Sequence, residues 1–278
     1  MEIITPIQAM RAVRRAEPEL SWGFVPTLGA LHEGHLSLVR RARAENDRVV
    51  ESIFVNPMQF ERQSDLQAYP RTVERDADLL NAEGVDVVWT PDEAEMYPPG
   101  FQTVVDVQAV TRRLEGEHRP GHLQGVTTIV TKLFNVVRPT RAYFGQKDAQ
   151  QAAAVRRLVL DLSMDIAIVV CPTEREADGL AMSSRNVLLT QEQRAAAPVL
   201  YRALSEAVRA WEAGEHQAEI LRSWMKTRIE SEPLAQIDYI SVADPDTLEE
   251  LHGPVDRALL SLAVYFGDVR LIDNMTVS

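Results

Sequence analysis

Two histidines, His32 and His35, lie three residues apart where an apolar run, residues 22–25, gives way to a helical pattern that continues to about residue 46. On a helix this spacing places both imidazoles on one face. A helix N-terminus also presents unpaired N–H groups and the positive end of the helix dipole, which together attract phosphate. Gly29 and Gly34 let the backbone come close to a ligand. The segment therefore predicts a nucleotide or phosphate site, in which imidazoles stabilise charge that develops in the transition state.

Two other interpretations of these histidines stay open. The first is a structural turn in which a histidine caps the helix. The second is a zinc site, but a helical zinc pair has the spacing H-E-x-x-H, without a glycine between the ligands, and the sequence offers no evident third ligand.

A second segment with chemical potential follows the apolar run 49–55. Asn56 ends that run, and Gln59 lies in the loop beyond it. Amide side chains provide neutral donors and acceptors that suit hydroxyls and carboxylates. Taken alone, Asn56 is better explained as the cap of a turn.

A third segment follows the apolar run 142–144, where Gly145 precedes Lys147 and Asp148. Lys147 can reach a phosphate as a point charge, and Asp148 can accept hydrogen bonds from ribose hydroxyls. Gln151 lies one helical turn beyond Lys147 and shares its face. Asp148 as a helix cap is the simpler alternative, and both roles are compatible.

Two loops carry further cations. Arg119 and His122 precede an apolar helical pattern at 126–137, as if a second helix N-terminus faced an anion, although a basic surface loop explains them equally well. In the other loop Ser183, Ser184 and Arg185 are clustered. That loop could close on a triphosphate and exclude water, and an ordinary solvated linker is the alternative.

The elements that must position these side chains alternate in type as far as about residue 170. Apolar strand patterns at 22–25, 49–55, 85–89, 142–144 and 166–170 are separated by helical patterns at 35–46, 71–83, 125–137 and 148–162. This alternation predicts an α/β fold with a Rossmann-like, mostly parallel sheet, whose ligands bind beyond the carboxyl ends of the strands.

The pattern changes after residue 173. A long helix is predicted over 190–213 and a second over 216–231, followed by strands at 237–242, 258–266 and 269–272. Gly267 and Asp268 indicate a hairpin between the last two strands. We therefore expect two domains: residues 1–173, and a smaller α+β domain with antiparallel strands at 174–278.

Composition narrows the class of protein. The chain has 278 residues, of which 45% are hydrophobic and 25% are charged, and its net charge is −12. This charge argues against a nucleic-acid binder but allows a cationic cleft for a small anion. No apolar run is long enough to cross a bilayer, and the N-terminus lacks the layout of a signal peptide. The single cysteine, Cys171, fits a buried strand thiol in a cytoplasmic protein.

Taken together, the five segments resemble pantothenate synthetases. The similarity covers nearly the whole chain, and it follows the family patterns P-T-M-G-A-L-H-x-G-H, F-V-N-P-x-Q-F, R-P-G-H-x-x-G-V, Y-F-G-x-K-D-x-Q-Q and D-G-L-A-x-S-S-R-N in order. The resemblance implies ATP-dependent ligation of pantoate and β-alanine through a pantoyl adenylate, with release of AMP and pyrophosphate. It also implies Mg²⁺ that accompanies ATP and is held mainly by phosphate oxygens, with no metal-binding residue assigned in the protein, and a homodimer.

The resemblance implies roles for individual residues. His35 is the usual assigned proton donor, and it is grouped as catalytic with His32, Lys147, Ser183, Ser184 and Arg185. Gln59 and Gln151 hold pantoate, and Gln59 also borders the position of β-alanine; Arg119 and His122 are lesser candidates near the amine. The ATP-binding residues are Leu28, Gly29, Ala30, Leu31, His32, Glu33, Gly34, His35, Gly145, Gln146, Lys147, Asp148, Glu174, Met182, Ser183, Ser184 and Arg185.

Two departures from the family pattern bear on the site. Leu28 replaces the usual methionine, a change between apolar side chains of similar size. Arg75 precedes Asp76 where many members carry an acidic residue, which weakens any claim that this pair binds a metal. Two rival functions remain: a related nucleotidyltransferase with another small acceptor, and a nucleotide sensor without turnover.

Overall fold

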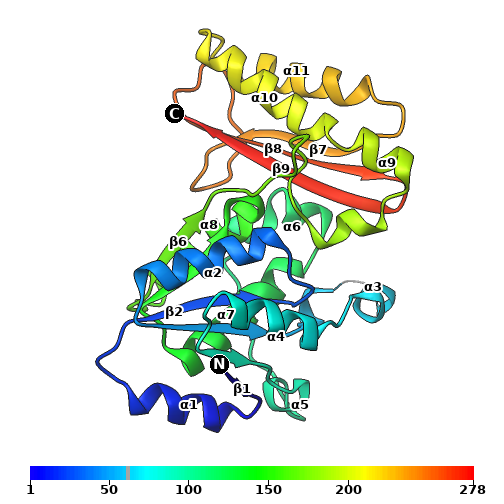
Figure 1. The fold of residues 1–278 in the computed structure, drawn as a ribbon. Coiled ribbons are helices and arrows are strands. Elements are labelled where there is room, and N and C mark those ends of the chain that lie inside the picture. Colours follow the sequence, from blue (N-terminus) through cyan, green and yellow to red (C-terminus); the bar gives the residue numbers. More distant parts are fainter. Residues whose placement is uncertain (61–62) are drawn as a thin grey trace.

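A computed structural model describes residues 1–60 and 63–278 (Figure 1). The larger of its two sheets has six parallel strands in the order β1-β4-β3-β2-β5-β6. The strands are β1 (Glu2–Ile4), β2 (Trp22–Thr27), β3 (Arg48–Ile53), β4 (Val87–Trp89), β5 (Arg141–Gly145) and β6 (Ala167–Cys171). The order reverses between β2 and β5, which pair directly. Ligands of such sheets bind beyond the carboxyl ends of the strands at this reversal.

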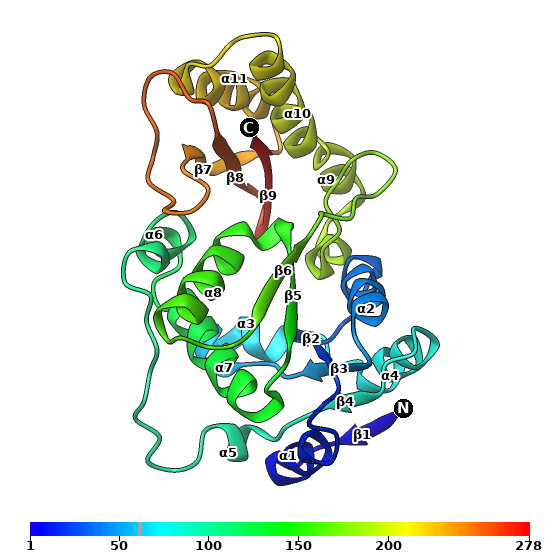
Figure 2. The same cartoon turned by 90° about the vertical axis from the view of Figure 1, so that its left-hand side faces the viewer.

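Helices cover both faces of the larger sheet (Figure 2). On one face lie α1 (Ile7–Ala16), α7 (His122–Val137) and α8 (Ala149–Asp161), which pack in one apolar cluster with strand residues such as Val50. On the other face lie α2 (Glu33–Glu45) and α4 (Val73–Ala82), which pack with Val49. Neighbouring strand residues thus face opposite layers, as the pleat requires.

Short helical segments connect these elements. They are α3 (Gln63–Ala68), α5 (Glu93–Met96), α6 (Glu115–His118) and four 3₁₀ turns, η1 (Pro57–Gln59), η2 (Val110–Arg112), η3 (Gln146–Asp148) and η4 (Ser184–Leu188). Within the described residues, no helix is both long enough and apolar enough to cross a membrane.

The second sheet has three antiparallel strands, β7 (Gln236–Ala243), β8 (Ala258–Phe266) and β9 (Val269–Val277), in that order. Helices α10 (Val199–Glu212) and α11 (Ala218–Glu230) pack on it, and α9 (Gln191–Ala196) precedes them. Figure 1 shows this sheet between α10 and α11 on one side and the larger sheet on the other. One face of the small sheet therefore lies toward the carboxyl edge of the larger sheet.

The predicted fold class is confirmed: a parallel α/β sheet followed by a smaller antiparallel part. The single helix predicted over 190–213 is wrong, because the chain breaks into α9 and α10 at Ala197 and Pro198, and proline has no N–H with which to continue the helix. The last strand runs to Val277 instead of ending at 272. Cys171 is buried and free, as expected. The division at residue 173 stays a prediction; β6 ends two residues before it.

Candidate active site

A cavity of about 260 Å³ lies at the carboxyl edge of the larger sheet, and residues of the small sheet close one side of it. Most of the residues predicted for the site line this cavity: Leu28, His32, Gly34, His35, Gln59, Gly145, Lys147, Asp148, Gln151, Glu174, Met182, Ser183, Ser184 and Arg185. Arg119 and His122 line it as well. The five segments, which are far apart in the sequence, thus converge on one space.

Five residues predicted to bind ATP lie outside the lining of the cavity: Gly29, Ala30, Leu31, Glu33 and Gln146. Leu31 is buried in the apolar cluster beneath α2. The carboxylate of Glu33 pairs with Arg40. Their assignment to ATP stays a prediction, and for Gly29, Ala30 and Leu31 the backbone has a clear structural task.

That task is a left-handed turn before the two histidines. Gly29 and Ala30 both have positive φ angles, 83° and 52°. The buried carboxylate of Asp76 accepts from the backbone N–H groups of Ala30, at 2.8 Å, and Leu31, at 3.0 Å. A Cβ at position 29 would lie 2.9 Å from Ile53 and 3.1 Å from Asp76. Asp76 therefore shapes the loop, a role that the sequence did not reveal because 45 residues separate it from Leu31.

The two histidines share the first turn of α2. His32 is the N-cap, and its Nδ1 accepts from the N–H of Gly34 at 3.1 Å. His35 Nδ1 accepts from the N–H of His32 at 3.4 Å. Burial lowers the pKa of His32 to about 4 and that of His35 to about 3; for both, the positive charge of Lys147 adds to the effect. Both imidazoles are therefore neutral, with the proton on Nε2.

These tautomers decide what the histidines can offer. With each Nδ1 already engaged as an acceptor, the available nitrogen is an Nε2–H donor. The two rings lie 4.1 Å apart between centroids. The alternative of a histidine cap is thus confirmed, and it is compatible with a paired donor site for an anion.

The loop that carries Lys147 is held by the small sheet. Asn274 of β9 donates from Nδ2 to the backbone carbonyls of Gln146 and Lys147, both at 2.9 Å, and its Oδ1 accepts from Gln146 Nε2 at 2.9 Å. Asp148 lies at the N-cap position of α8 but makes no capping bond; its carboxylate is 4.0 Å from Lys147 Nζ. Asn274 was not predicted as part of the site, although the polar pair Asp273-Asn274 directly after the predicted strand 269–272 was a signal in the sequence; the structure shows both residues to be buried.

Gln59 is oriented by Asn56. The buried Asn56 donates from Nδ2 to Gln59 Oε1 and to the carbonyl of Gly125, both at 3.1 Å. Its Oδ1 accepts from the N–H of Met58 at 3.3 Å and from the hydroxyl of Tyr97 at 2.7 Å. Asn56 is therefore fully bonded and caps the turn, as the simpler alternative held. Because the oxygen of Gln59 is engaged, its NH₂ group is the part available to a ligand.

His122 has the opposite tautomer. Its Nδ1 lies 2.8 Å from the backbone carbonyl of Gln59, which can only accept, so Nδ1 carries the proton. Burial lowers its pKa to about 4, and the charge of Arg119 contributes. Nε2 of His122 is thus left as an acceptor.

The loop with the two serines is anchored next to the cavity. Ser183 Oγ accepts from the N–H of Arg185 at 3.2 Å. Asn186 donates to Glu176 at 3.0 Å and to the carbonyl of Ala181 at 3.2 Å. The side chain of Arg185, one of the cations predicted for the site, is exposed to solvent. The loop therefore has a fixed base and a solvent-facing cation.

Comparisons with known proteins agree with this geometry. A family model described as pantoate-beta-alanine ligase matches residues 2–276. Pantothenate synthetases from Herpetosiphon aurantiacus and from a Roseiflexus species are 55% identical over 279 residues and 57% identical over 274 residues. The alignments cover 100% of both chains in the first case, and 99% of this chain and 98% of the relative in the second.

Solved structures agree as well. The structure of the pantothenate synthetase from Thermus thermophilus superposes with a TM-score of 0.94 at 46% identity, covering 99% of each chain. The ligase from Francisella tularensis, in complex with beta-gamma ATP and beta-alanine, has a TM-score of 0.82 at 36% identity and covers 99% of this chain and 97% of its own. The chain belongs to the pantoate–β-alanine ligase family of enzymes.

Proposed function

We propose that this chain joins pantoate to β-alanine at the expense of ATP by way of a pantoyl adenylate. In the first step a carboxylate oxygen of pantoate bonds to the α-phosphorus, and the bond to the bridging oxygen breaks to release pyrophosphate. In the second step the neutral amine of β-alanine bonds to the acyl carbon and releases a proton, the acyl–phosphate bond breaks, and pantothenate and AMP leave. The convergence of His32, His35 and Lys147 at one cavity carries this proposal.

The phosphate site uses hydrogen bonds and one fixed charge. The Nε2–H groups of His32 and His35 donate to phosphate oxygens, because both rings are neutral and their Nδ1 atoms are engaged. A pKa of about 3 means that His35 holds no second proton near neutral pH. We therefore assign it a hydrogen bond to the developing charge instead of proton transfer. Lys147 supplies the positive charge.

The remaining ATP contacts come from the strand ends and the serine loop. Gly145 and Asp148 border the nucleoside, and the backbone near Glu174 lies against the adenine. The carbonyl of Glu174 already accepts from the N–H of Met182 at 2.9 Å, which fixes this part of the wall. Ser183, Ser184 and Arg185 close on the triphosphate from their anchored base.

The acid and the amine bind at the opposite end of the cavity. The NH₂ group of Gln59, left over from its contact with Asn56, donates to pantoate, and Gln151 provides a second amide. Gln59 also borders β-alanine. The acceptor Nε2 of His122 receives a hydrogen bond from the ammonium group of β-alanine, and Arg119 faces its carboxylate. Both residues line the same cavity.

The part of the chain that the structure describes holds no group of three or more His, Cys, Asp or Glu side chains suited to a metal ion. The carboxylate of Asp76, which lies beside the turn that precedes the histidines, is engaged by backbone N–H groups. Mg²⁺ that accompanies ATP would therefore be held mainly by phosphate oxygens, where it neutralises phosphate charge. We also propose that the protein is a cytoplasmic homodimer.

An omission experiment tests the overall reaction. The protein is incubated with pantoate, β-alanine, ATP and Mg²⁺, and each component is then dropped in turn while AMP, ADP and pantothenate are measured. AMP and pantothenate in equal amounts, only in the complete mixture, are expected. A dinucleotide product would indicate the rival nucleotidyltransferase, and ATP binding without any product would indicate a sensor.

A further inference from the structure

A second cavity, of about 390 Å³, lies between the C-terminal ends of α1 and α7. Four arginines line it: Arg11, Arg14 and Arg15 of α1, and Arg138, which follows α7. Helix α1 lies at the bottom of Figure 1, at the far end of the molecule from the small sheet. We call this cavity the arginine pocket; its volume is in the range of small-molecule sites.

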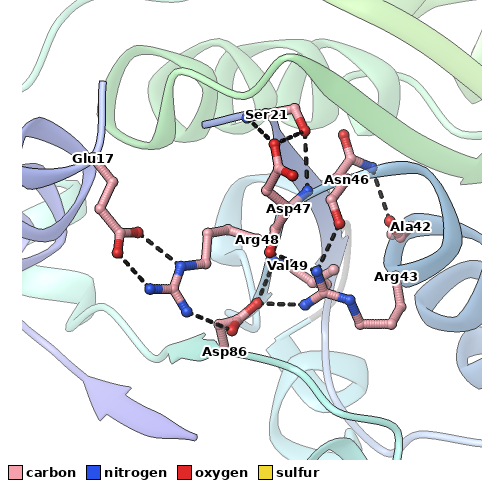
Figure 3. Close-up of polar contacts among 9 residues, drawn as sticks. All are labelled: Glu17, Ser21, Ala42, Arg43, Asn46, Asp47, Arg48, Val49 and Asp86. Atoms are coloured by element: carbon pink, nitrogen blue, oxygen red, sulfur yellow. Dashed lines mark hydrogen bonds and ion pairs between the residues drawn. The ribbon is translucent and has the colours of Figure 1, made fainter. Parts of the chain in front are cut away.

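No carboxylate balances these arginines. None of the four guanidinium groups forms an ion pair with a carboxylate in the described ranges, residues 1–60 and 63–278. The acidic residue nearest in sequence is Glu17, but its carboxylate is bound to Arg48, which also contacts Asp86 (Figure 3). This is unusual in a chain with 41 acidic and 29 basic residues.

Arg14 is held in place within this uncompensated group. Its guanidinium lies 5.6 Å from the centre of the Trp22 ring, and it donates to the carbonyls of Arg138 and Glu17 at 3.2 and 3.1 Å. Burial and the positive charge of Arg138 lower the pKa of Arg14. A fixed cation beside other cations is unfavourable unless an anion joins them.

Helix dipoles explain only part of the cluster. Each helix C-terminus provides the equivalent of about −0.5 charge, so α1 and α7 together supply roughly −1 against four positive charges. The remaining charge, about +3, suits a compact multivalent anion. Arginine is also the side chain best matched to phosphate, since its planar fork binds two oxygens at once.

We propose that the arginine pocket binds a small phosphorylated molecule with at least two negative charges. A polyanion such as nucleic acid fits less well, because the rest of the surface is acidic at a net charge of −12.

The pocket is separate from the candidate active site. The arginine pocket lies at the edge of the larger sheet where β2 and β5 begin, whereas the active-site cavity lies at the carboxyl ends of these strands. With six residues in β2, about 20 Å of strand lies between the two edges. Binding in the arginine pocket therefore leaves the active site accessible, and the inference does not rest on the proposed reaction.

Hydrogen–deuterium exchange with inorganic tripolyphosphate, in the absence of ATP, tests this proposal. In the wild-type protein, peptides covering residues 7–20 and 131–139 should gain protection. The double variant Arg15→Gln/Arg138→Gln should need at least about ten times more tripolyphosphate for the same protection. Both side chains are exposed, and neither forms a hydrogen bond or an ion pair with another described residue. Protection of residues 28–36, at the active site, should stay as in wild type.

A matched control separates this site from general charge effects. Arg156→Gln/Arg209→Gln removes the same charge from exposed positions on α8 and α10, and it should behave as wild type. The proposal is overturned if the two peptides gain no protection, or if both double variants weaken protection equally. Protection by single-stranded DNA but not by tripolyphosphate would also overturn it.

Discussion

The buried carboxylate of Asp76 offers a sharp test of how the histidine turn is built. It accepts from the backbone N–H groups of Ala30 and Leu31, and it also lies 3.1 Å from the hydroxyl of Thr72. Asp76→Asn keeps one acceptor oxygen but turns an NH₂ group toward one of the two backbone donors. One buried donor then loses its partner, which costs about 1–3 kcal/mol. Because the change also removes a buried charge, we expect a loss near the middle of this range, about 2 kcal/mol.

Urea unfolding at pH 7 measures this loss, and Asp78→Asn is the matched control because Asp78 lies on the same helix and is exposed. Asp76→Asn should also slow pyrophosphate exchange into ATP, since the turn positions His32 and His35. The control should change the free energy of unfolding by less than about 0.5 kcal/mol. If Asp76→Asn matched the control in both stability and exchange, the role given to Asp76 would be wrong.

Three further predictions concern charge, recognition and pH. Lys147→Ala should slow adenylation by ~10²–10³, while Lys226→Ala, at an exposed position on α11, should have no effect; near-normal exchange by folded Lys147→Ala would count against the assignment. Gln59→Ala should raise the KM for pantoate much more than that for ATP, by the factor that corresponds to about 1–3 kcal/mol of lost binding; a change confined to ATP would refute this placement. His35 and His122 have pKa values lowered to about 3 and 4, so the unfolded chain binds protons that the folded chain does not, and stability is lost as pH falls below about 6.5. At pH 5 each buried histidine lowers the free energy of unfolding by about 2 kcal/mol. The stability lost between pH 7 and pH 5, measured by urea unfolding, should therefore shrink by about that much in His122→Gln. An unchanged pH dependence would exclude a buried, neutral His122.

Much of the fold was predictable because its signals are local. Apolar runs such as residues 22–25 form strands, and β2 begins at Trp22. The errors came where the signal was ambiguous or weak. The amphipathic pattern over 190–213 continues through Pro198, although the helix does not. In β9, the polar pair Asp273-Asn274 interrupts the apolar pattern and concealed the last residues of the strand.

The convergence of most of the predicted site residues on one cavity could be predicted from the sequence, but the residues that support them could not. The residues that face the cavity occur in short segments next to strand ends, where residue types and spacing are informative. Their supports are distant in sequence: Asp76 reaches back to Ala30, and Asn274 lies 127 residues from Lys147. The tautomers of His35 and His122 likewise depend on bonded neighbours that spacing alone does not reveal.

Isotope exchange between pyrophosphate and ATP tests the central claim most directly. If the reaction passes through a pantoyl adenylate, labelled pyrophosphate should enter ATP when pantoate is present and β-alanine is absent. His35→Ala should abolish most of this exchange in a folded protein, because His35 is assigned to the transition state. Exchange that does not need pantoate, or release of ADP with exchange of phosphate instead, would contradict the account.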